Sequence, residues 1–252
     1  MIVRGDFSQL ADDYAKYRPS YSQTIAKVIL GLSDRPRSLI NAADIGAGTG
    51  IWSRVMQKEG VSSLFAVEPN DEMRSRGEAV SSGITWIKGT AEKTTLKTQS
   101  LDLVSMASAF HWADTDSALN EFHRILRPGG ILALLWNPRL TEKSREETCI
   151  QNILENKYNV RSRVSSGRQG ITTKLTRILS EKEKFSDVMY CEAEHSRNVT
   201  REQYIGTWRS VNDVRNQLGE VMFGEFLKEI MHIVGADITV HYTTRAWVAR
   251  AS

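Results

Sequence analysis

The sequence is poor in cysteine and has no long apolar run. These absences argue against a disulfide-rich protein and against a membrane-spanning one. Its 252 residues include two cysteines, Cys149 and Cys191, which form neither a disulfide framework nor a zinc pattern. We interpret them as ordinary thiols of a reducing compartment. No stretch approaches the ~18 apolar residues that a membrane span needs, and the first residues show no apolar segment of a signal peptide. The expectation is a cytoplasmic protein that does not enter a membrane.

A strong charge and a metal-ligand pattern are lacking as well. The formal net charge of +3 is too small to indicate a nucleic-acid partner without a clustered basic patch. The basic stretch 161–184 lacks interleaved aromatic residues, so we interpret it as a solvated loop and helix face. The five histidines form no H-x-x-x-H pattern, so no metal site is predicted.

The most informative feature present is a glycine turn between an apolar run and a helical pattern. Residues 39–43 are mainly apolar, Asp44 follows them, glycines stand at 46, 48 and 50, and a helical pattern begins at Ile51. A strand, a glycine turn and a helix open a nucleotide-binding βαβ unit. The next apolar run ends at Glu68, about 20 residues downstream, where an acid at a strand tip reaches a ribose diol.

The glycine spacing distinguishes between two classes of cofactor. A dinucleotide fingerprint, G-x-G-x-x-G, would require glycine at position 51, where this chain has Ile51. A hydride-transfer set such as Tyr-x-x-x-Lys is also missing. A nicotinamide-dependent oxidoreductase is therefore the less favoured alternative.

Several segments together resemble one enzyme family. The loop D-x-G-x-G-x-G at 44–50 resembles motif I of class I S-adenosylmethionine (SAM)-dependent methyltransferases. Residues 14–21 resemble the Y-x-x-x-R-P-x-Y lid segment of their small-molecule branch, and 89–92 resemble the G-x-A-E segment that borders adenine. Residues 126–132 resemble the L-[KR]-P-G-G motif before strand five. The phrase Thr-Trp-x-Ser at 207–210 resembles a cap helix of trans-aconitate and related methyltransferases, the group that includes ubiquinone and menaquinone methyltransferases.

The resemblance implies SAM as the cofactor and assigns residues to it. The glycine loop accommodates the methionine moiety and ribose, Arg18 pairs with the methionine carboxylate, and Glu68 binds the ribose diol. The full expected cofactor set is Tyr14, Arg18, Asp44, Gly46, Ala47, Gly48, Thr49, Gly50, Glu68, Pro69, Met73, Thr90, Ala91, Glu92, Ala107 and Ser108.

The alternation of elements predicts an α/β fold. We expect strands near 38–45, 63–68, 84–88, 101–107 and 131–136, with helices near 50–59, 71–81 and 115–126, and two last strands around 188–191 and 238–248. The predicted class is a Rossmann-like, doubly wound, seven-stranded, mostly parallel sheet with an antiparallel last strand and a helical cap. Residues 1–252 would form a single methyltransferase domain, with an N-terminal lid at 8–31 and cap insertions at 139–185 and 199–235.

Aromatic and polar side chains outside the cofactor loops are candidates for the acceptor pocket. The expected set is Tyr17, Tyr21, His111, Trp112, Trp136, Trp208 and Ser210. His111 follows strand four, where the transferred methyl group should point. Two roles remain open for it: a general base for a hydroxyl acceptor, or a structural group that shapes the pocket.

The expected function is methyl transfer from SAM to an oxygen, nitrogen or carbon atom of a small molecule. A non-catalytic SAM-binding module is the alternative that the sequence leaves open. A nucleic-acid methyltransferase would carry a loop of the Asn-Pro-Pro-Tyr type after strand four, and residues 108–111 do not match it. The acceptor and the oligomeric state stay undetermined at this point.

Overall fold

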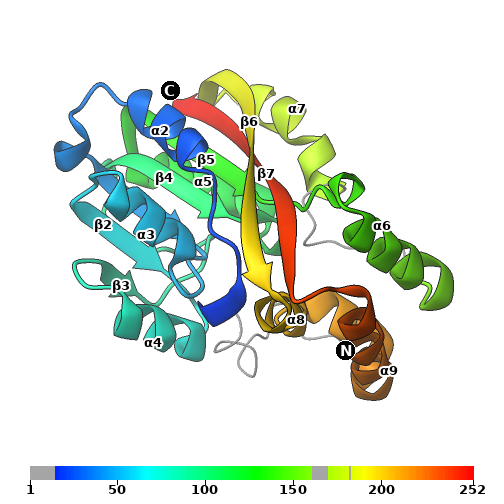
Figure 1. Cartoon of the computed structure of the whole chain (residues 1–252). Coiled ribbons are helices and arrows are strands. Elements are labelled where there is room, and N and C mark those ends of the chain that lie inside the picture. Colours follow the sequence, from blue (N-terminus) through cyan, green and yellow to red (C-terminus); the bar gives the residue numbers. More distant parts are fainter. Residues whose placement is uncertain (1–14, 161–169, 182) are drawn as a thin grey trace.

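A seven-stranded sheet forms the centre of the molecule in the computed structural model, which describes residues 15–160, 170–181 and 183–252 (Figure 1). The strand order is β3-β2-β1-β4-β5-β7-β6. The strands are β1 (Asn41–Ile45), β2 (Ser63–Val67), β3 (Thr85–Ile87), β4 (Leu101–Ala107), β5 (Leu126–Trp136), β6 (Phe185–Thr200) and β7 (Asp237–Ala251). The first five pair in parallel, while β7 runs antiparallel to both β5 and β6. The predicted fold class is confirmed.

Helices cover both faces of the sheet, as right-handed crossovers between parallel strands require. On one face, α2 (Gln23–Gly31) and α3 (Ile51–Lys58) share an apolar cluster with the strands. On the other face, α5 (Thr115–Ile125) and α7 (Leu175–Ser180) share a second cluster. The helix α4 (Asp71–Val80) joins β2 to β3, and its N-cap residue Asn70 accepts a hydrogen bond from the Met73 amide. Short 3₁₀ turns lie at η2 (Arg37–Leu39), η3 (Phe110–Trp112), η4 (Thr141–Lys143) and η7 (Gly170–Thr173).

The last two strands are much longer than the sequence pattern indicated. They stay paired from Phe185 opposite Ala251 to Thr200 opposite Asp237, whereas β5 pairs with β7 only at residues 245–250. The free half of this ribbon leaves the sheet and packs against a third apolar cluster. That cluster contains α6 (Arg145–Asn152), the π-helical turn η5 (Ile153–Lys157), α8 (Arg201–Arg209) and α9 (Asn212–Ile233).

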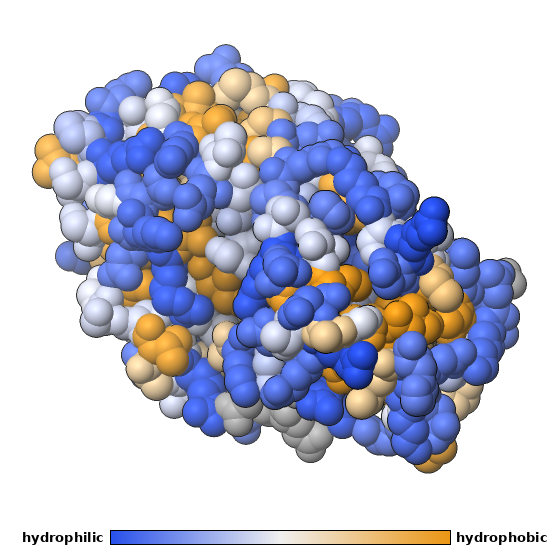
Figure 2. All heavy atoms as spheres, viewed as in Figure 1, coloured by the Kyte–Doolittle hydropathy of each residue, from blue (hydrophilic) through white to orange (hydrophobic). Residues whose placement is uncertain are grey.

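We call α6, η5, α8 and α9 the cap, which lies at the lower right of Figure 1. A capping box formed by Thr200 and Gln203 begins α8. From the same side, the space-filling view shows apolar residues at the centre and toward α9, within a largely hydrophilic surface (Figure 2). Among the described helices, none is long and apolar enough to cross a membrane.

The turn between α5 and β5 differs slightly from the expectation. Residues 127–130 were expected to separate the helix from a strand that begins near 131, and Gly129 indeed has φ +75°. The strand already begins at Leu126, however, because Leu126 pairs with Leu101 before the register shifts.

Trp86 of β3 packs against two backbone positions that therefore must be glycine. A Cβ atom at Gly77, in the middle of α4, would lie 2.0 Å from the Trp86 ring. A Cβ atom at Gly50, the N-cap of α3, would lie 2.9 Å from the same ring. The indole thus fixes α4 and the glycine loop against the edge of the sheet.

This packing predicts that Gly77→Ala destabilises the protein although alanine is the better helix former. The alanine methyl group would overpack the Trp86 ring, at a cost of ~1–3 kcal/mol that exceeds the gain in helix propensity of ~1 kcal/mol. The matched control is Gly224→Ala in α9, where a Cβ atom would meet nothing within 4 Å. Urea unfolding should show a loss for Gly77→Ala and a gain for Gly224→Ala, and two gains would contradict the packing argument.

Candidate active site

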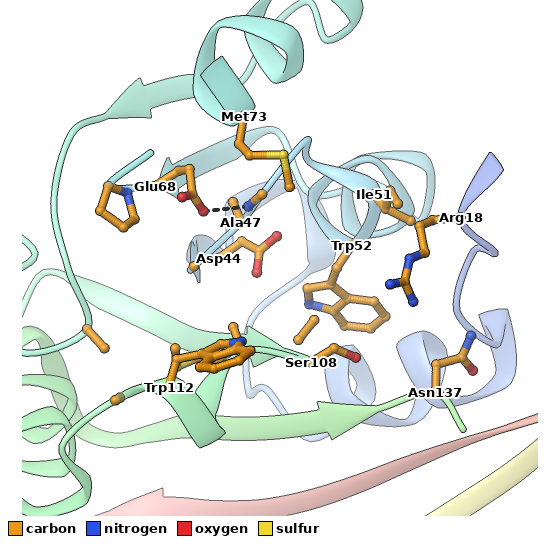
Figure 3. A pocket seen from close by; sticks show the side chains of 18 of the residues that line it. Arg18, Asp44, Ala47, Ile51, Trp52, Glu68, Met73, Ser108, Trp112 and Asn137 are labelled. Carbon is orange, nitrogen blue, oxygen red and sulfur yellow. Dashed lines mark hydrogen bonds between the residues drawn. The ribbon is translucent and has the colours of Figure 1, made fainter. Parts of the chain in front are cut away.

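Loops at the carboxyl ends of the parallel strands surround one cavity of about 350 Å³, a size typical of small-molecule sites (Figure 3). The N-terminal segment and the start of α9 complete its walls. The lining residues from β-strand ends and their loops are Asp44, Gly46, Ala47, Gly48, Glu68, Pro69, Thr90, Ala91, Glu92, Met106, Ala107, Ser108, Ala109, Trp112, Ala113 and Asn137. The others are Arg18, Pro19, Tyr21, Ile51, Trp52, Met73, Asn212 and Asp213.

Most of the residues expected at a cofactor site line this cavity. They are Arg18, Asp44, Gly46, Ala47, Gly48, Glu68, Pro69, Met73, Thr90, Ala91, Glu92, Ala107 and Ser108. Thr49 is fully buried and Gly50 caps α3 under Trp86, so both support the loop from behind the cavity wall. Tyr14 lies outside the described residues, as do residues 8–13 of the expected lid.

The glycine loop is held closely against the end of β2. The amides of Gly46 and Ala47 donate to the carbonyl oxygen of Val67 at 2.8 and 3.1 Å. Gly46 and Gly48 have φ +65° and +59°, which only glycine adopts without strain. A Cβ atom at Gly46 would also lie 2.9 Å from the Ala109 side chain, in the loop after β4. The backbone of the loop is therefore exposed directly to the cavity.

The carboxylate of Glu68 joins two loops of the site. Its Oε2 accepts a hydrogen bond from the Gly48 amide at 2.8 Å, and its Oε1 accepts one from the Asn70 amide at 2.9 Å. Burial raises the pKa of Glu68, against the effect of these two amides, which lower it. Because a carboxylate offers about four lone-pair positions, it retains acceptor capacity for two further donors.

Asp44 is a second buried acid in the same wall. Its Oδ2 accepts a 2.6 Å hydrogen bond from the Ser53 hydroxyl, whereas no described residue is hydrogen-bonded to its buried Oδ1. Burial raises the pKa of Asp44 to about 7, and the negative charge of Glu68 acts in the same direction. A buried carboxylate oxygen without a partner at a cavity wall fits a cationic donor from a ligand.

Ser108 stands at the end of β4 in an unusual backbone conformation. Its φ of +54° lies in the left-handed region, which costs about 1–3 kcal/mol for a residue other than glycine and is characteristic of functional sites. The Tyr21 hydroxyl donates to its Oγ at 3.0 Å. This contact ties the N-terminal segment to the strand end at the cavity, and both residues line the cavity as expected.

Tyr17 and Arg18 attach the N-terminal segment to α8. The Tyr17 ring fills the notch left by Gly206, where a Cβ atom would lie 2.4 Å from the ring. The Thr207 hydroxyl donates to the Tyr17 carbonyl oxygen at 3.0 Å, and Arg18 donates to the Ser210 carbonyl oxygen at 2.9 Å. The segment and the cap are thus in direct contact beside the cavity.

Several residues expected in the acceptor pocket do not line the cavity. Tyr17 and Ser210 are buried in the contact between the N-terminal segment and α8. Trp208 packs edge-on against Phe226 inside the cap. Trp136 is buried in the apolar cluster on the sheet face that α5 and α7 cover. The aromatic pattern that suggested a pocket lining reflects helix and sheet packing here. Tyr21 and Trp112 do line the cavity.

A buried ion pair fixes the cap to the end of the sheet. Arg139 donates to Glu147 Oε1 at 3.1 Å, and the Tyr204 hydroxyl donates to the same oxygen at 2.5 Å. The Arg139 guanidinium also lies 4.6 Å from the centre of the Trp208 ring. Separating Arg139 from Glu147 would leave a buried charge without its partner, which is costly. The cluster therefore favours the observed packing of α6, which carries Glu147, against α8, which carries Tyr204.

Sequence reasoning did not find three polar residues of the cavity wall. Asn137 directly follows β5, so the rule that ligands bind at carboxyl strand ends would have indicated it. Figure 3 shows it near Arg18, on the side of the cavity opposite Glu68. Asn212 and Asp213 begin α9, and only the tertiary structure brings that helix start to the cavity. Within the described ranges, no cluster of three or more His, Cys, Asp or Glu side chains is arranged to hold a metal ion.

His111 lies behind the cavity wall rather than in it, next to the lining residue Trp112. The Trp136 indole, which can only donate, gives its Nε1 proton to His111 Nδ1 at 3.4 Å. The neutral ring therefore carries its own proton on Nε2, which is buried and has no hydrogen-bond partner among the described residues. Burial lowers the pKa of His111 to about 4, although the charge of Asp213 opposes this. The arrangement favours the structural role over the general base.

We predict that His111 stays neutral, with its proton on Nε2, throughout the physiological pH range. In a nitrogen-15 NMR titration, its ring should begin to protonate only near pH 4, well below the ordinary value of about 6.5. The spectrum of His111→Gln assigns the signal, and Trp136→Phe, which removes the indole donor, should weaken the tautomer preference. A midpoint near pH 6.5 would restore His111 as a candidate base.

Comparisons with known proteins agree with the geometry of the cavity. Residues 43–134 match the model of a methyltransferase domain. The chain is 35% identical over 133 residues to an uncharacterized methyltransferase of Mycobacterium bovis, across 53% of this chain and 52% of that protein. It is 26% identical over 155 residues to a ubiquinone/menaquinone biosynthesis C-methyltransferase of Campylobacter jejuni, across 57% and 66% of the two chains.

The sequence similarity to these relatives covers only part of the chain, whereas the structural similarity to a solved structure covers nearly all of it. The chain spans about half the length of the M. bovis relative that it matches. A solved structure from Anaeromyxobacter dehalogenans, whose description reads "putative type II methyltransferase", superposes with a TM-score of 0.68 at 20% identity. That superposition covers 93% of this chain and 98% of the other, so the cap belongs to the shared fold.

Proposed function

We propose that this chain, whose residues 43–134 match the model of a methyltransferase domain, transfers the methyl group of SAM to a small-molecule acceptor. The observation that carries the proposal is the convergence of the glycine loop, Glu68, residues 90–92 and Ser108 on one cavity. These groups come from the ends of β1, β2, β3 and β4, where open α/β sheets bind their ligands.

The cavity offers a suitable partner for each polar part of SAM. The ammonium group fits the unpartnered Oδ1 of Asp44, and the carboxylate fits Arg18. The ribose hydroxyls fit the remaining lone pairs of Glu68, while the adenine ring fits between Met73 and residues 90–92. SAM supplies an electrophilic methyl group, and the protein supplies alignment of the acceptor and exclusion of water.

The N-terminal segment and the cap would provide that exclusion. We assign residues 8–31 to a lid and residues 139–185 and 199–235 to cap insertions of a single domain, 1–252. In support, Tyr17 and Arg18 contact α8, and Asn212 and Asp213 reach the cavity from α9. A cover made from two segments that are distant in the sequence would become ordered when ligands bind and would exclude water from the methyl transfer.

Calorimetry with S-adenosylhomocysteine (SAH) and NAD tests the cofactor assignment. The chain should bind SAH and not NAD, and Glu68→Ala should weaken SAH binding by ~2–3 kcal/mol, the worth of hydrogen bonds to a charged group. The matched control is Glu72→Ala, which removes an exposed acid from the first turn of α4. NAD binding without SAH binding would refute the assignment of SAM as the cofactor. If folded Glu68→Ala bound SAH as tightly as the wild-type protein, Glu68 would not be a cofactor-binding residue.

Asp44 gives SAH binding a characteristic pH dependence. Its pKa of about 7 in the free protein means that half of the molecules must lose a proton at neutrality before Asp44 pairs with the ligand ammonium. The dissociation constant should therefore rise about tenfold as the pH falls from 8 to 6. Asp44→Asn should bind SAH more weakly at pH 8 and lose most of this dependence. Since Glu68 also has a raised pKa, an unchanged dependence in Asp44→Asn would assign the effect to Glu68.

A further inference from the structure

We propose that the acceptor is an amine, which binds as an ammonium group at the α9 end of the cavity against the carboxylate of Asp213. This inference rests on the proposed function and names its substrate class. Two independent observations lead to it: the charges of the cavity wall, and the position and protonation of the nearest histidine.

The cavity wall has an excess of acids. Among the described lining residues, four are acidic (Asp44, Glu68, Glu92 and Asp213) and one, Arg18, is basic. Bound SAM, with a sulfonium, an ammonium and a carboxylate, would add a single net positive charge. The sum stays negative, which disfavours an anionic acceptor and favours a cationic one, because like charges in a partly enclosed site repel strongly.

Asp213 is the acidic lining residue that lies outside the strand-end loops, and its Oδ1 accepts a hydrogen bond from the Val214 amide at 2.9 Å. Asp44 lies at the carboxyl end of β1, and Glu68 and Glu92 follow β2 and β3, on the proposed cofactor side, whereas Asp213 is half-buried in the first turn of α9. It lies three residues after Ser210, whose carbonyl oxygen accepts from Arg18. It is also the only charged lining residue that the described part of the cap contributes. A first-turn acid is common at a helix start, and this one also lines the cavity.

The chemistry of proton removal separates an amine from a hydroxyl. A hydroxyl acceptor needs a strong base close to the reacting oxygen. Trp136 occupies His111 Nδ1, and the other nitrogen of that ring carries a proton, so this imidazole presents no lone pair to the cavity. An amine needs only to lose its ammonium proton, because the neutral nitrogen is then a sufficient nucleophile.

The transfer balances with the groups present. The ammonium group first loses its proton to water. The nitrogen lone pair then forms the bond to the methyl carbon while the sulfur–carbon bond breaks, and that electron pair remains on sulfur. The products are the N-methylated amine, SAH and one proton.

The test uses three probes with one skeleton: phenethylamine, phenethyl alcohol and 3-phenylpropionate. The phenyl ring suits a wall that contains Tyr21 and the partly exposed Trp112. Each probe is titrated by calorimetry into the full-length protein loaded with SAH. The amine should bind at least about tenfold more tightly than the alcohol or the acid, as expected for a hydrogen-bonded ion pair.

Substitutions at Asp213 assign the preference to this residue. Asp213→Asn should remove the preference for the amine and Asp213→Glu should retain it, while SAH affinity stays within about twofold in both, since the proposed site lies apart from the cofactor groups. Glu146→Gln, an exposed first-turn acid of α6, is the control and should change nothing.

The outcomes distinguish this inference from the function on which it rests. Tighter binding of the acid or the alcohol, no binding of the amine to the loaded protein, or an unchanged preference in Asp213→Asn would overturn the amine assignment. Failure of the wild-type protein to bind SAH would instead overturn the proposed function.

Discussion

The site depends above all on the two hydrogen bonds that Glu68 accepts from backbone amides. A carboxylate buried to this degree is tolerable only when its oxygens are hydrogen-bonded, and Gly48 and Asn70 supply the donors from two different loops. The carbonyl oxygen of the preceding residue, Val67, accepts from the first loop as well. The end of β2 thus determines where the glycine loop lies. The Glu68 carboxylate, which would destabilise the fold if it were buried without partners, connects the glycine loop to the loop that contains Asn70.

A second constraint is the proximity of Asp44 and Glu68. Both are nearly inaccessible to water, and each raises the free energy of the other when both are ionised. In the free protein, burial above all and the charge of Glu68 in addition raise the pKa of Asp44 and favour its partial protonation, whereas a cationic ligand would stabilise the ionised form. The same residues that make the empty site unfavourable therefore make it selective for a ligand with positive charge. Selectivity of this kind does not require that the cavity change shape.

Most residues that the sequence predicted for the cofactor site line the cavity, whereas several of those predicted for the acceptor pocket do not, and the difference has physical reasons. Carboxyl ends of parallel strands must meet at one edge of a sheet, so Asp44, Glu68 and Glu92 were predictable once the strands were recognised. Tyr17 and Trp208 carried no comparable constraint, because an aromatic residue on a helix packs equally well against a ligand or a neighbouring helix. Asp213 was not predictable at all, since its place at the cavity results from the length of β6 and β7 and the helices that they carry beyond the sheet.

The contact between Tyr17 and Gly206 joins the N-terminal segment to α8 beside the cavity. The ring occupies space that any side chain at position 206 would fill, so this close approach requires glycine there. Arg18, the next residue, contacts both the cavity and the chain just before α9. A ligand carboxylate that attracts Arg18 therefore acts on the segment, on the end of α8 and on the start of α9 together. Asp213 lies on that same helix start, so Arg18 and Asp213 approach the cavity from neighbouring stretches of chain, joined through the hydrogen bond between Arg18 and the Ser210 carbonyl oxygen.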